Sequence, residues 1–341
     1  FDHALKLDEN DPWAWVQRGD VLDNLQRYEE ALESCDRALK LEANYQWAWA
    51  KRGDVLDNLQ RYEEALESFD RAIALDDNYQ WAWTNRGNVL TYLKRYNEAL
   101  ESVDRAIELD ASYQWAWAKR GDVLDNLKRY EEALVSYDRA LELDANDQWA
   151  WFSRGWTLDN LGRYEEALIS CDKAIELGDK SSSVFFNRAI AILGLNRWDE
   201  GIATLDDAFQ RLEPGDEAEA DDAKLIINNL FANTQDKAIC QTRITSLIAV
   251  YEKHKYLSVL GQGIVRNIPA LMSEIVSDKS ARTWLELWQE LTSKYEQFQI
   301  PIRLLNAAVR YKETKGDRRV LLELAIEERH LLEPLVSTKP E

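Results

Sequence analysis

The chain has 341 residues, of which 30% are charged and 45% hydrophobic, a composition that predicts a soluble, foldable protein. Its formal charge is −20, and residues 1–222 hold 48 acidic against 25 basic side chains, whereas residues 223–341 hold 14 against 17. An acidic surface repels phosphate, which excludes sequence-independent nucleic-acid binding and disfavours an anionic membrane. No apolar run approaches the ~20 residues that span a bilayer, and no signal peptide is visible.

A stretch of 34 residues repeats along the first part of the chain. Trp-Ala-Trp begins at residues 13, 47, 81, 115 and 149, and RGDVLDNL recurs unchanged at 18–25, 52–59 and 120–127. A fixed period of this size indicates an array of stacked units. Full units begin near Pro12, Gln46, Gln80, Gln114 and Gln148, and a diverged sixth unit begins near Ser182.

The beginning of the chain predicts a missing upstream part. Residues 1–11 match the end of a repeat, and the single methionine is Met272. We therefore interpret the chain as a piece cut from a longer protein.

Each unit is predicted to form two helices. In the first helix Trp15, Gly19 and Leu22 recur three or four residues apart and share one face. The second helix follows a polar corner and carries the small residues Ala31 and Ala38 on its apolar stripe. Neither helix can bury its stripe alone, so the core must form between stacked neighbours. Small residues at fixed contacts let two backbones approach closely.

The repeat pattern resembles the tetratricopeptide repeat over residues 1 to about 213, through Trp15, Gly19, Leu22, Tyr28, Ala31 and Ala38. This resemblance implies an all-α fold: a right-handed superhelix of about five full repeats, with a partial repeat at 1–11 and a diverged one at 182–212. Two departures stand out. The closing proline is replaced, and the residue before the glycine, usually Leu in the family, is Arg18, Arg52, Arg86, Arg120 and Arg154.

The C-terminal part is predicted to be a separate helical domain. The acidic segment 213–222 is expected to link the solenoid (1–212) to this domain (223–341), in which the period is lost. Helical patterns continue without strand signals, and Pro269 and Pro301 fit helix starts. This tail resembles those attached to repeat arrays in large prokaryotic proteins, behind a nucleotide-switching ATPase of the STAND type.

The sequence contains no catalytic constellation. The histidines His3, His254 and His330 are isolated, and there is no P-loop. Cys35 and Cys171 occupy one repeat position, so we expect them in the core of a protein from a reducing compartment. These observations predict a cytoplasmic protein without enzymatic activity, cofactor or bound metal.

The two tryptophans of each repeat are predicted to face opposite ways. Residues two apart on a helix lie about 200° apart, so Trp13 cannot share the face of Trp15. In the tetratricopeptide family the second face of the first helix lines a concave groove. Carried over residue by residue, the resemblance places there Trp13, Trp47, Trp81, Trp115 and Trp149, with Asp20, Asp54, Asn88 and Asp122, then Asp23, Asp57, Thr91, Asp125 and Asp159, and Asn24, Asn58, Tyr92, Asn126 and Asn160.

Two interpretations of the Trp13-type rings remain open. Each ring either packs onto the preceding repeat or is partly exposed and grips a ligand. The acidic and amide residues beside it favour the second, because packing does not require Asp there. Aromatic rings flanked by carboxylates suit a partner that carries Lys or Arg. We therefore predict an interaction scaffold that binds a basic peptide or protein on its concave face.

Two alternative functions are kept. The chain is a sensor or regulatory region of a larger switch protein, of STAND type or similar, whose activity lies upstream. Alternatively, the C-terminal domain, with its slight positive charge, docks in the groove of the acidic array.

Overall fold

The structure is a computed structural model that describes residues 9–212, 222–223, 225–226, 237–274, 299–314, 320, 324, 328 and 330–332. The described residues form helices, turns and bends without a strand, which confirms the all-α prediction. The chain divides into two compact units, Phe1–Thr157 and Leu158–Glu341. The predicted acidic linker, apart from Asp222, lies outside the described residues.

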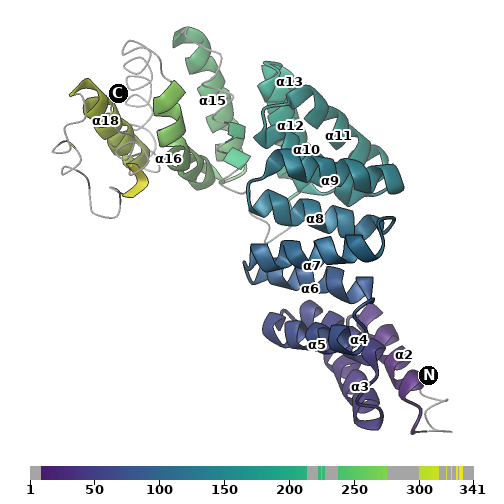
Figure 1. Cartoon of the computed structure of the whole chain (residues 1–341). Helices are drawn as coiled ribbons and strands as arrows, with labels where there is room; N and C mark the ends of the chain where they lie inside the picture. Colours follow the sequence, from purple (N-terminus) through teal and green to yellow (C-terminus); the bar gives the residue numbers. More distant parts are fainter. Residues whose placement is uncertain are drawn as a thin grey trace. The chain divides into compact units, whose positions relative to one another are not determined.

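The first unit is a series of helical pairs (Figure 1). Every first helix begins at the residue that the sequence predicts. The helices are α2 Pro12–Asn24, α3 Tyr28–Leu41, α4 Gln46–Asn58, α5 Tyr62–Leu75, α6 Gln80–Tyr92, α7 Tyr96–Leu109, α8 Gln114–Asn126, α9 Tyr130–Leu143 and α10 Gln148–Asn160, which continues into the second unit.

Local chemistry explains where these helices begin and end. Asp11 caps α2, because its carboxylate accepts hydrogen bonds from the backbone amides of Trp13 (3.0 Å) and Ala14 (3.3 Å). The corner between paired helices contains a residue in the left-handed region, as at Gln60 with a φ of 58°. That turn lets the amide of Arg61 donate to the carbonyl of Leu56 (2.8 Å), which satisfies a helix-terminal acceptor.

The packing glycines allow the two helices of a repeat to touch. A Cβ atom added at Gly53 would lie 2.8 Å from the ring of Phe69, and one at Gly121 would overlap the ring of Tyr137. Both aromatic side chains are fully buried. The prediction that small residues permit close approach of the backbones is therefore confirmed, because no larger side chain fits at these contacts.

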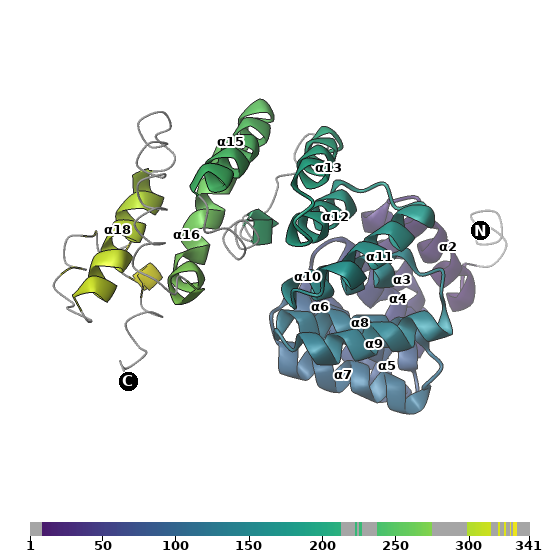
Figure 2. The ribbon, with the colours of Figure 1, turned by 90° about the horizontal axis from the view of Figure 1, so that it is seen from above.

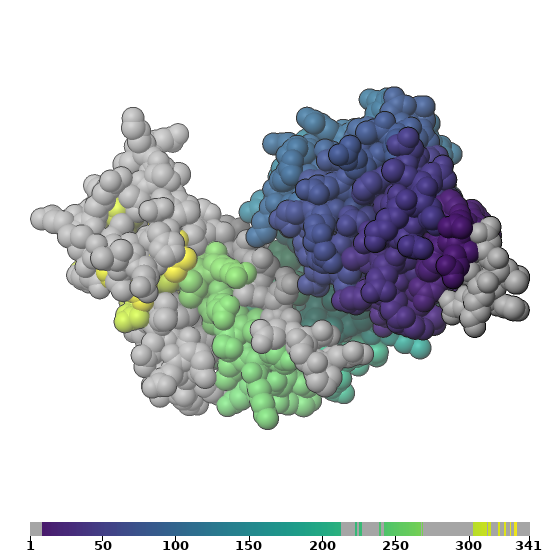
Figure 3. Space-filling view, turned by 90° about the horizontal axis from the view of Figure 1, so that it is seen from below, coloured from purple at the N-terminus to yellow at the C-terminus, as the bar shows by residue number. Residues whose placement is uncertain are grey.

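First helices form a layer of their own in this unit. α2 contacts α4, α4 contacts α6 and α6 contacts α8, whereas the second helices contact each other less. This difference curves the stack toward the first helices, which we call the concave layer (α2, α4, α6, α8 and α10 as far as Thr157). Figure 2 shows α5, α7 and α9 along the opposite side of these helices. The space-filling view shows successive repeats in close contact (Figure 3).

An arginine before each packing glycine joins three helices. Nε of Arg52 donates to Asp36 on α3 (2.8 Å), and a terminal nitrogen donates to Ser68 on α5 (2.7 Å). Its guanidinium carbon also lies 5.9 Å from the ring centroid of Trp49 on α4. We call this set the arginine clamp; Arg86 and Arg120 make the same hydrogen bonds one and two repeats later. The clamp explains why Arg replaces the usual Leu.

The second unit combines the last repeats with the described part of the tail. Its core includes Phe186, Phe209, Tyr251, Leu260 and Leu304, from five different helices. The described tail helices therefore bury their apolar faces together with the diverged repeat. The helices are α11 Tyr164–Glu176, α12 Ser182–Gly194, α13 Trp198–Gln210, α15 Lys237–Lys253, α16 Leu257–Glu274, α18 Gln299–Glu313 and the 3₁₀ helix η3 His330–Leu332.

One prediction for the tail is wrong. Pro269 was expected to begin a helix, but α16 runs through it to Glu274. An interior proline removes one backbone hydrogen bond. The helix nevertheless continues, since Leu260, Ile264 and Ile268 hold it in the core immediately before the proline.

Replacing Arg86 tests the arginine clamp. Arg86→Ala removes the bonds to Asp70 (2.7 Å) and Ser102 (2.6 Å) and the stacking on Trp83. We expect the free energy of unfolding to fall by about 1–3 kcal/mol in urea titrations, because the lost hydrogen bonds involve a charged group. Arg71→Ala, an exposed arginine on α5, is the control and should change it by less than about 0.5 kcal/mol. Equal effects would contradict the clamp.

Candidate functional site

The five Trp13-type residues stand at the starts of the first helices, on the concave layer. Trp13 and Trp149, at its two ends, have 53% and 52% of their surface exposed. Trp47, Trp81 and Trp115 between them are partly buried. We call this row of five rings the tryptophan ladder. Its two end rings are therefore half exposed, and its three middle rings are partly buried.

The middle rings pack onto the repeat before them. Trp81 meets Phe69 of the preceding repeat edge to face, with ring centroids 6.1 Å apart, and stacks on Tyr79 at 5.9 Å. Trp47 packs against a core that includes Val16 and Ala38 of the preceding repeat. Both interpretations thus apply in part, because these rings stabilise the stacking and still keep some exposed surface.

Lysines of the chain itself lie over two of the rings. Nζ of Lys51 is 5.3 Å from the ring centroid of Trp81, and Nζ of Lys119 is 5.7 Å from that of Trp149. The sequence shows these lysines at one groove-edge position of the second and fourth repeats, but reasoning from it missed their contact with the tryptophans. The cation–π contact expected from a partner is therefore already made, on one side of each ring, by the chain.

The same lysines form ion pairs with aspartates beside the rings. We call these aspartates of the first helices the carboxylate ladder (Asp20, Asp23, Asp54, Asp57, Asp122 and Asp125). Lys51 lies 2.6 Å from Asp20 and 3.3 Å from Asp54, and Lys119 lies 3.0 Å from Asp122. These acidic residues are only a quarter or so exposed, so the pairs are more shielded than ordinary surface pairs. The ladder is thus partly neutralised from within.

Side-chain amides link the ladder between repeats. The Asn58 amide donates to Asp23 (2.9 Å), and the Asn88 amide donates to Asp57 (3.1 Å). Asn126 instead donates back to the carbonyl of Asp122 on its own helix (2.8 Å). The amides of the second and third repeats therefore bridge to the repeat before them, whereas Asn24 of the first repeat, like Asn126 of the fourth, donates back to its own helix.

The third repeat gives the concave layer an uncharged centre. It carries Asn88, Thr91 and Tyr92 where the repeats on either side carry two aspartates and an asparagine. Tyr92 is 57% exposed, and its ring stacks on that of Tyr62 at 4.9 Å. An exposed aromatic surface thus separates two acidic stretches.

Burial raises the pKa values of several aspartates in the carboxylate ladder. It raises the pKa of Asp57 to about 6, although the hydrogen bond from Asn88 opposes this shift. Burial likewise raises the pKa of Asp23 and of Asp54. Asp159, only 2% exposed, is no part of an open surface, and burial raises its pKa well above its ordinary value.

The fourth repeat is the most polar point of the layer. Its second helix carries Tyr137 where other repeats have Cys, Phe or Val, and the hydroxyl reaches past Gly121 to Asp122 (3.0 Å) and Asp125 (2.8 Å). Thr157 also donates to Asp125 (2.8 Å). Reasoning from the sequence placed this repeat position in the core and did not assign Tyr137 to the site. Its hydroxyl, at a position where the other repeats carry Cys, Phe or Val, was the signal that could have found it.

Sequence comparison identifies the repeats. The pattern described as tetratricopeptide repeat matches residues 12–45, 81–113 and 115–147, a second of the same description matches 46–79, and a third matches 136–169. The repeats between residues 12 and 169 belong to the tetratricopeptide-repeat family. The predicted repeat starts at residues 12 and 46 coincide with those of the matches. A comparison with curated proteins found no match.

Solved structures of other tetratricopeptide-repeat proteins share the fold. PilF of Pseudomonas aeruginosa has a TM-score of 0.54 and 22% identity, covering 61% of this chain and 94% of that one. PilW, a type IV pilus biogenesis factor, has a TM-score of 0.55 and 20% identity, covering 59% and 95%. YrrB, described as having an unusual peptide-binding site, has a TM-score of 0.42 and 26% identity, covering 54% and 94%.

The described residues provide neither a membrane-spanning helix nor a cluster of metal ligands. None of the described helices has the length and apolar character required to cross a membrane. No group of three or more His, Cys, Asp or Glu side chains suited to a metal ion occurs in the part of the chain that the structure describes.

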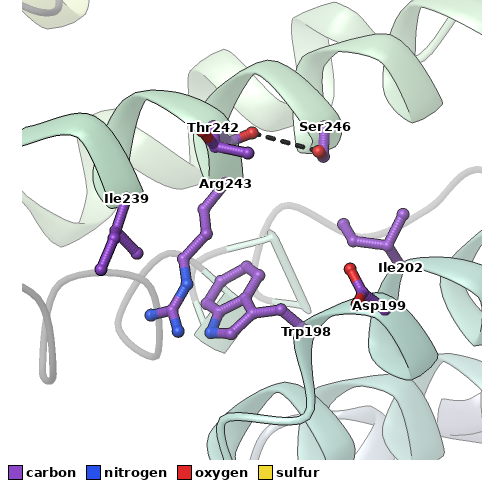
Figure 4. Close-up of a pocket in the computed structure, with 7 residues that line it drawn as sticks. All are labelled: Trp198, Asp199, Ile202, Ile239, Thr242, Arg243 and Ser246. Carbon is purple, nitrogen blue, oxygen red and sulfur yellow. Dashed lines mark hydrogen bonds between the residues drawn. The ribbon is translucent and has the colours of Figure 1, made fainter.

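A pocket of ≈ 450 Å³ lies between α13 and α15 of the second unit (Figure 4). The guanidinium of Arg243 lies over Trp198, 4.5 Å from its ring centroid. Trp198 begins the second helix of its repeat, as Tyr62 does, and α15 belongs to the described part of the tail. The pocket therefore belongs to the junction of repeat and tail. Its lining residues are Trp198, Asp199, Ile202, Ile239, Thr242, Arg243 and Ser246.

The pKa of Asp57 predicts how stability depends on pH. Its pKa rises on folding from 3.8 to about 6, so its contribution to stability is complete below 3.8 and is lost as the pH rises through about 6. We expect the thermal midpoint to fall by about 2–4 °C across this range. Asp57→Asn keeps an acceptor for Asn88 and should reduce this fall in calorimetric scans.

Glu64→Gln is the contrasting control. The hydrogen bond from Arg61 lowers the pKa of Glu64. The contribution of Glu64 to stability is therefore present at pH values above its ordinary pKa of 4.5, and it is lost as the pH falls below that value. This variant should leave the fall between pH 4 and pH 6 unchanged. A wild-type midpoint that stays flat across that range, or a fall that Asp57→Asn leaves intact, contradicts the assignment.

Proposed function

We propose that the first unit of this tetratricopeptide-repeat protein binds a protein or peptide with basic residues along its concave layer, without catalysing a reaction. The observation that carries the proposal is Trp149. Half of its surface is exposed, while its indole N–H donates to Asp122 (3.2 Å) and Phe152 lies beside it at 5.5 Å. A large aromatic ring held rigidly beside a carboxylate suits a cationic side chain.

The exposure of Trp149 is not needed for stacking. Trp81, the equivalent of Trp149 two repeats earlier, contacts the buried Phe69 of the repeat before it. In the repeat before Trp149 the position of Phe69 is taken by Tyr137, and its hydroxyl donates to the carboxylates Asp122 and Asp125. Lys119 occupies one side of the Trp149 ring, which leaves the exposed side for a partner. Trp149 is thus the ring best placed to contact a cationic side chain of a partner while it remains in contact with Lys119.

Charge along the layer supports a partner with two basic stretches. The first two repeats carry four ladder carboxylates and Lys51, and the fourth carries two and Lys119. Between them lies the uncharged third repeat with exposed Tyr92. Opposite charges arranged in this way select partners and set the register of binding more than they add affinity. The carboxylates are Asp20, Asp23, Asp54, Asp57, Asp122 and Asp125.

Trp149→Ala tests the proposal. The probe is a tetra-arginine peptide with blocked ends, and its affinity for the whole chain is measured by calorimetry at low salt. We expect the substitution to weaken binding about three- to tenfold, the range of one cation–π contact. Raising the salt should weaken binding by wild-type protein as well, because exposed charges are screened.

Val135→Ala is the matched control. Val135 lies on α9 of the same unit, is 63% exposed and points away from the concave layer, so its loss should leave affinity unchanged. A blocked tetra-glutamate peptide should bind more weakly than tetra-arginine. Equal affinity for the two peptides, or full affinity of a folded Trp149→Ala variant, would refute binding of a basic partner on this surface.

A further inference from the structure

A hydrogen-bonded network in the fourth repeat contains more acceptors than its own hydroxyl protons can serve. Tyr137 lies 2.8 Å from Asp125 and 3.0 Å from Asp122. Thr157 lies 2.8 Å from Asp125 and 2.8 Å from the carbonyl oxygen of Ser153. Each hydroxyl brings one proton but has two acceptors at hydrogen-bond distance.

One additional proton satisfies this network. Thr157 donates to Asp125 (2.8 Å), whereas the single proton of Tyr137 lies between two carboxylates, Asp122 and Asp125, so one of the two must itself carry a proton. Tyr137 donates to Asp122, whose charge is also stabilised by Lys119 (3.0 Å). Asp125 is only 9% exposed, so an unprotonated carboxylate would be a poorly solvated charge there.

Among the residues that the structure describes, no cation is directed at Asp125. The titratable groups that face it are Asp122 on its own helix and Tyr137 on α9. On α10, Thr157 is uncharged and Arg154 instead pairs with Asp138 (2.7 Å). α6, which also packs against α8, carries the uncharged Asn88 and Thr91 at the matching positions.

Burial, opposed by these hydrogen bonds and aided by Asp122, raises the pKa of Asp125 to about 7. This agrees with the proton inventory. A group that titrates near neutrality responds to any charge that arrives beside it. Asp122 shares Tyr137 with Asp125 and also accepts the N–H of Trp149, so a cation that docks on Trp149 arrives next to this network.

We propose that Asp125 is a proton-operated switch in the concave layer: it holds a proton while the surface is free and releases it to solvent when a cationic side chain docks on Trp149 and Asp122. This inference rests on the proposed function and adds its regulation. Affinity for a basic partner then rises with pH, because the surface that binds is the one without the proton.

Two measurements on the whole chain test this. The first follows the carboxyl carbon of Asp125 by NMR from pH 5 to pH 9 without peptide, with Asp125→Asn for assignment. The second measures tetra-arginine binding by calorimetry at pH 7 in two buffers of different ionisation enthalpy, which counts released protons. If docking lowers the pKa from about 7 to about 6, we expect release of about 0.4 proton at pH 7 and an affinity about fivefold higher at pH 8 than at pH 6.

Variants separate the switch from general charge effects. Asp125→Asn imitates the protonated side chain, so it should bind as weakly as wild type at low pH and release no proton. Tyr137→Phe reproduces the residue of the second repeat, where Phe69 packs under Gly53, and should fold while shifting the pH dependence upward, because a donor to ionised Asp125 is lost. Glu142→Gln, outside the concave layer, removes one carboxylate and should leave proton release unchanged.

The outcomes are distinguishable. An Asp125 carboxyl that titrates near its ordinary value, or pH-independent binding by wild type, overturns the switch alone. Failure of tetra-arginine to bind at any pH overturns the proposed function and the switch with it. Binding with proton release that Asp125→Asn abolishes supports both.

Discussion

The arginine clamp is the interaction on which the rest of the array depends. One guanidinium holds its own second helix through a serine, the preceding second helix through an aspartate, and its own first helix through a tryptophan. The inward tryptophan is held in turn, since the Trp49 indole N–H donates to the carbonyl of Ala43 in the loop before its helix (2.9 Å). None of these bonds uses the Trp13-type rings or the aspartates beside them, so those positions of the first helices are left free to carry residues that stacking does not require.

That freedom explains why near-identical repeats present different surfaces. Lysines occur at one edge of the layer only in the second and fourth repeats, and there each lies over the tryptophan of the next repeat. The third repeat replaces aspartates by neutral side chains, and the fourth places a tyrosine hydroxyl between two carboxylates. A uniform scaffold thus displays a varied row of aromatic, acidic and amide groups, as expected of a family whose function lies in a displayed surface.

Much of the fold was predictable because the period is short and strict. The helix starts at Pro12, Gln46 and Gln80 follow from the repeat alone, and the packing glycines follow from their fixed spacing to the aromatic rings. The clamp was noticed only as a departure from Leu, because its partners sit on two other helices. Pro269 was misjudged since a local rule for proline could not weigh the packing that precedes it.

Sequence reasoning could not tell which rings of the candidate site are exposed. Trp13 and Trp149 are half exposed, but exposure depends on what the preceding repeat offers, and Phe69 covers part of Trp81. Burial raises the pKa values of Asp57 and Asp125, and hydrogen bonds from Asn88 and Thr157, more than 30 residues away along the chain, oppose that rise. Such distant contacts have no signature in a 34-residue pattern.

The indole N–H resonances of the tryptophans give the most direct test of the central claim. A chain labelled with ¹⁵N at tryptophan is titrated with blocked tetra-arginine, and each resonance is assigned by substitution. Shifts concentrated at Trp149, with inward rings such as Trp49 and Trp83 unmoved because their N–H groups stay bonded to backbone carbonyls, are the predicted result. Shifts of the inward rings without a shift at Trp149 would contradict binding on the concave layer.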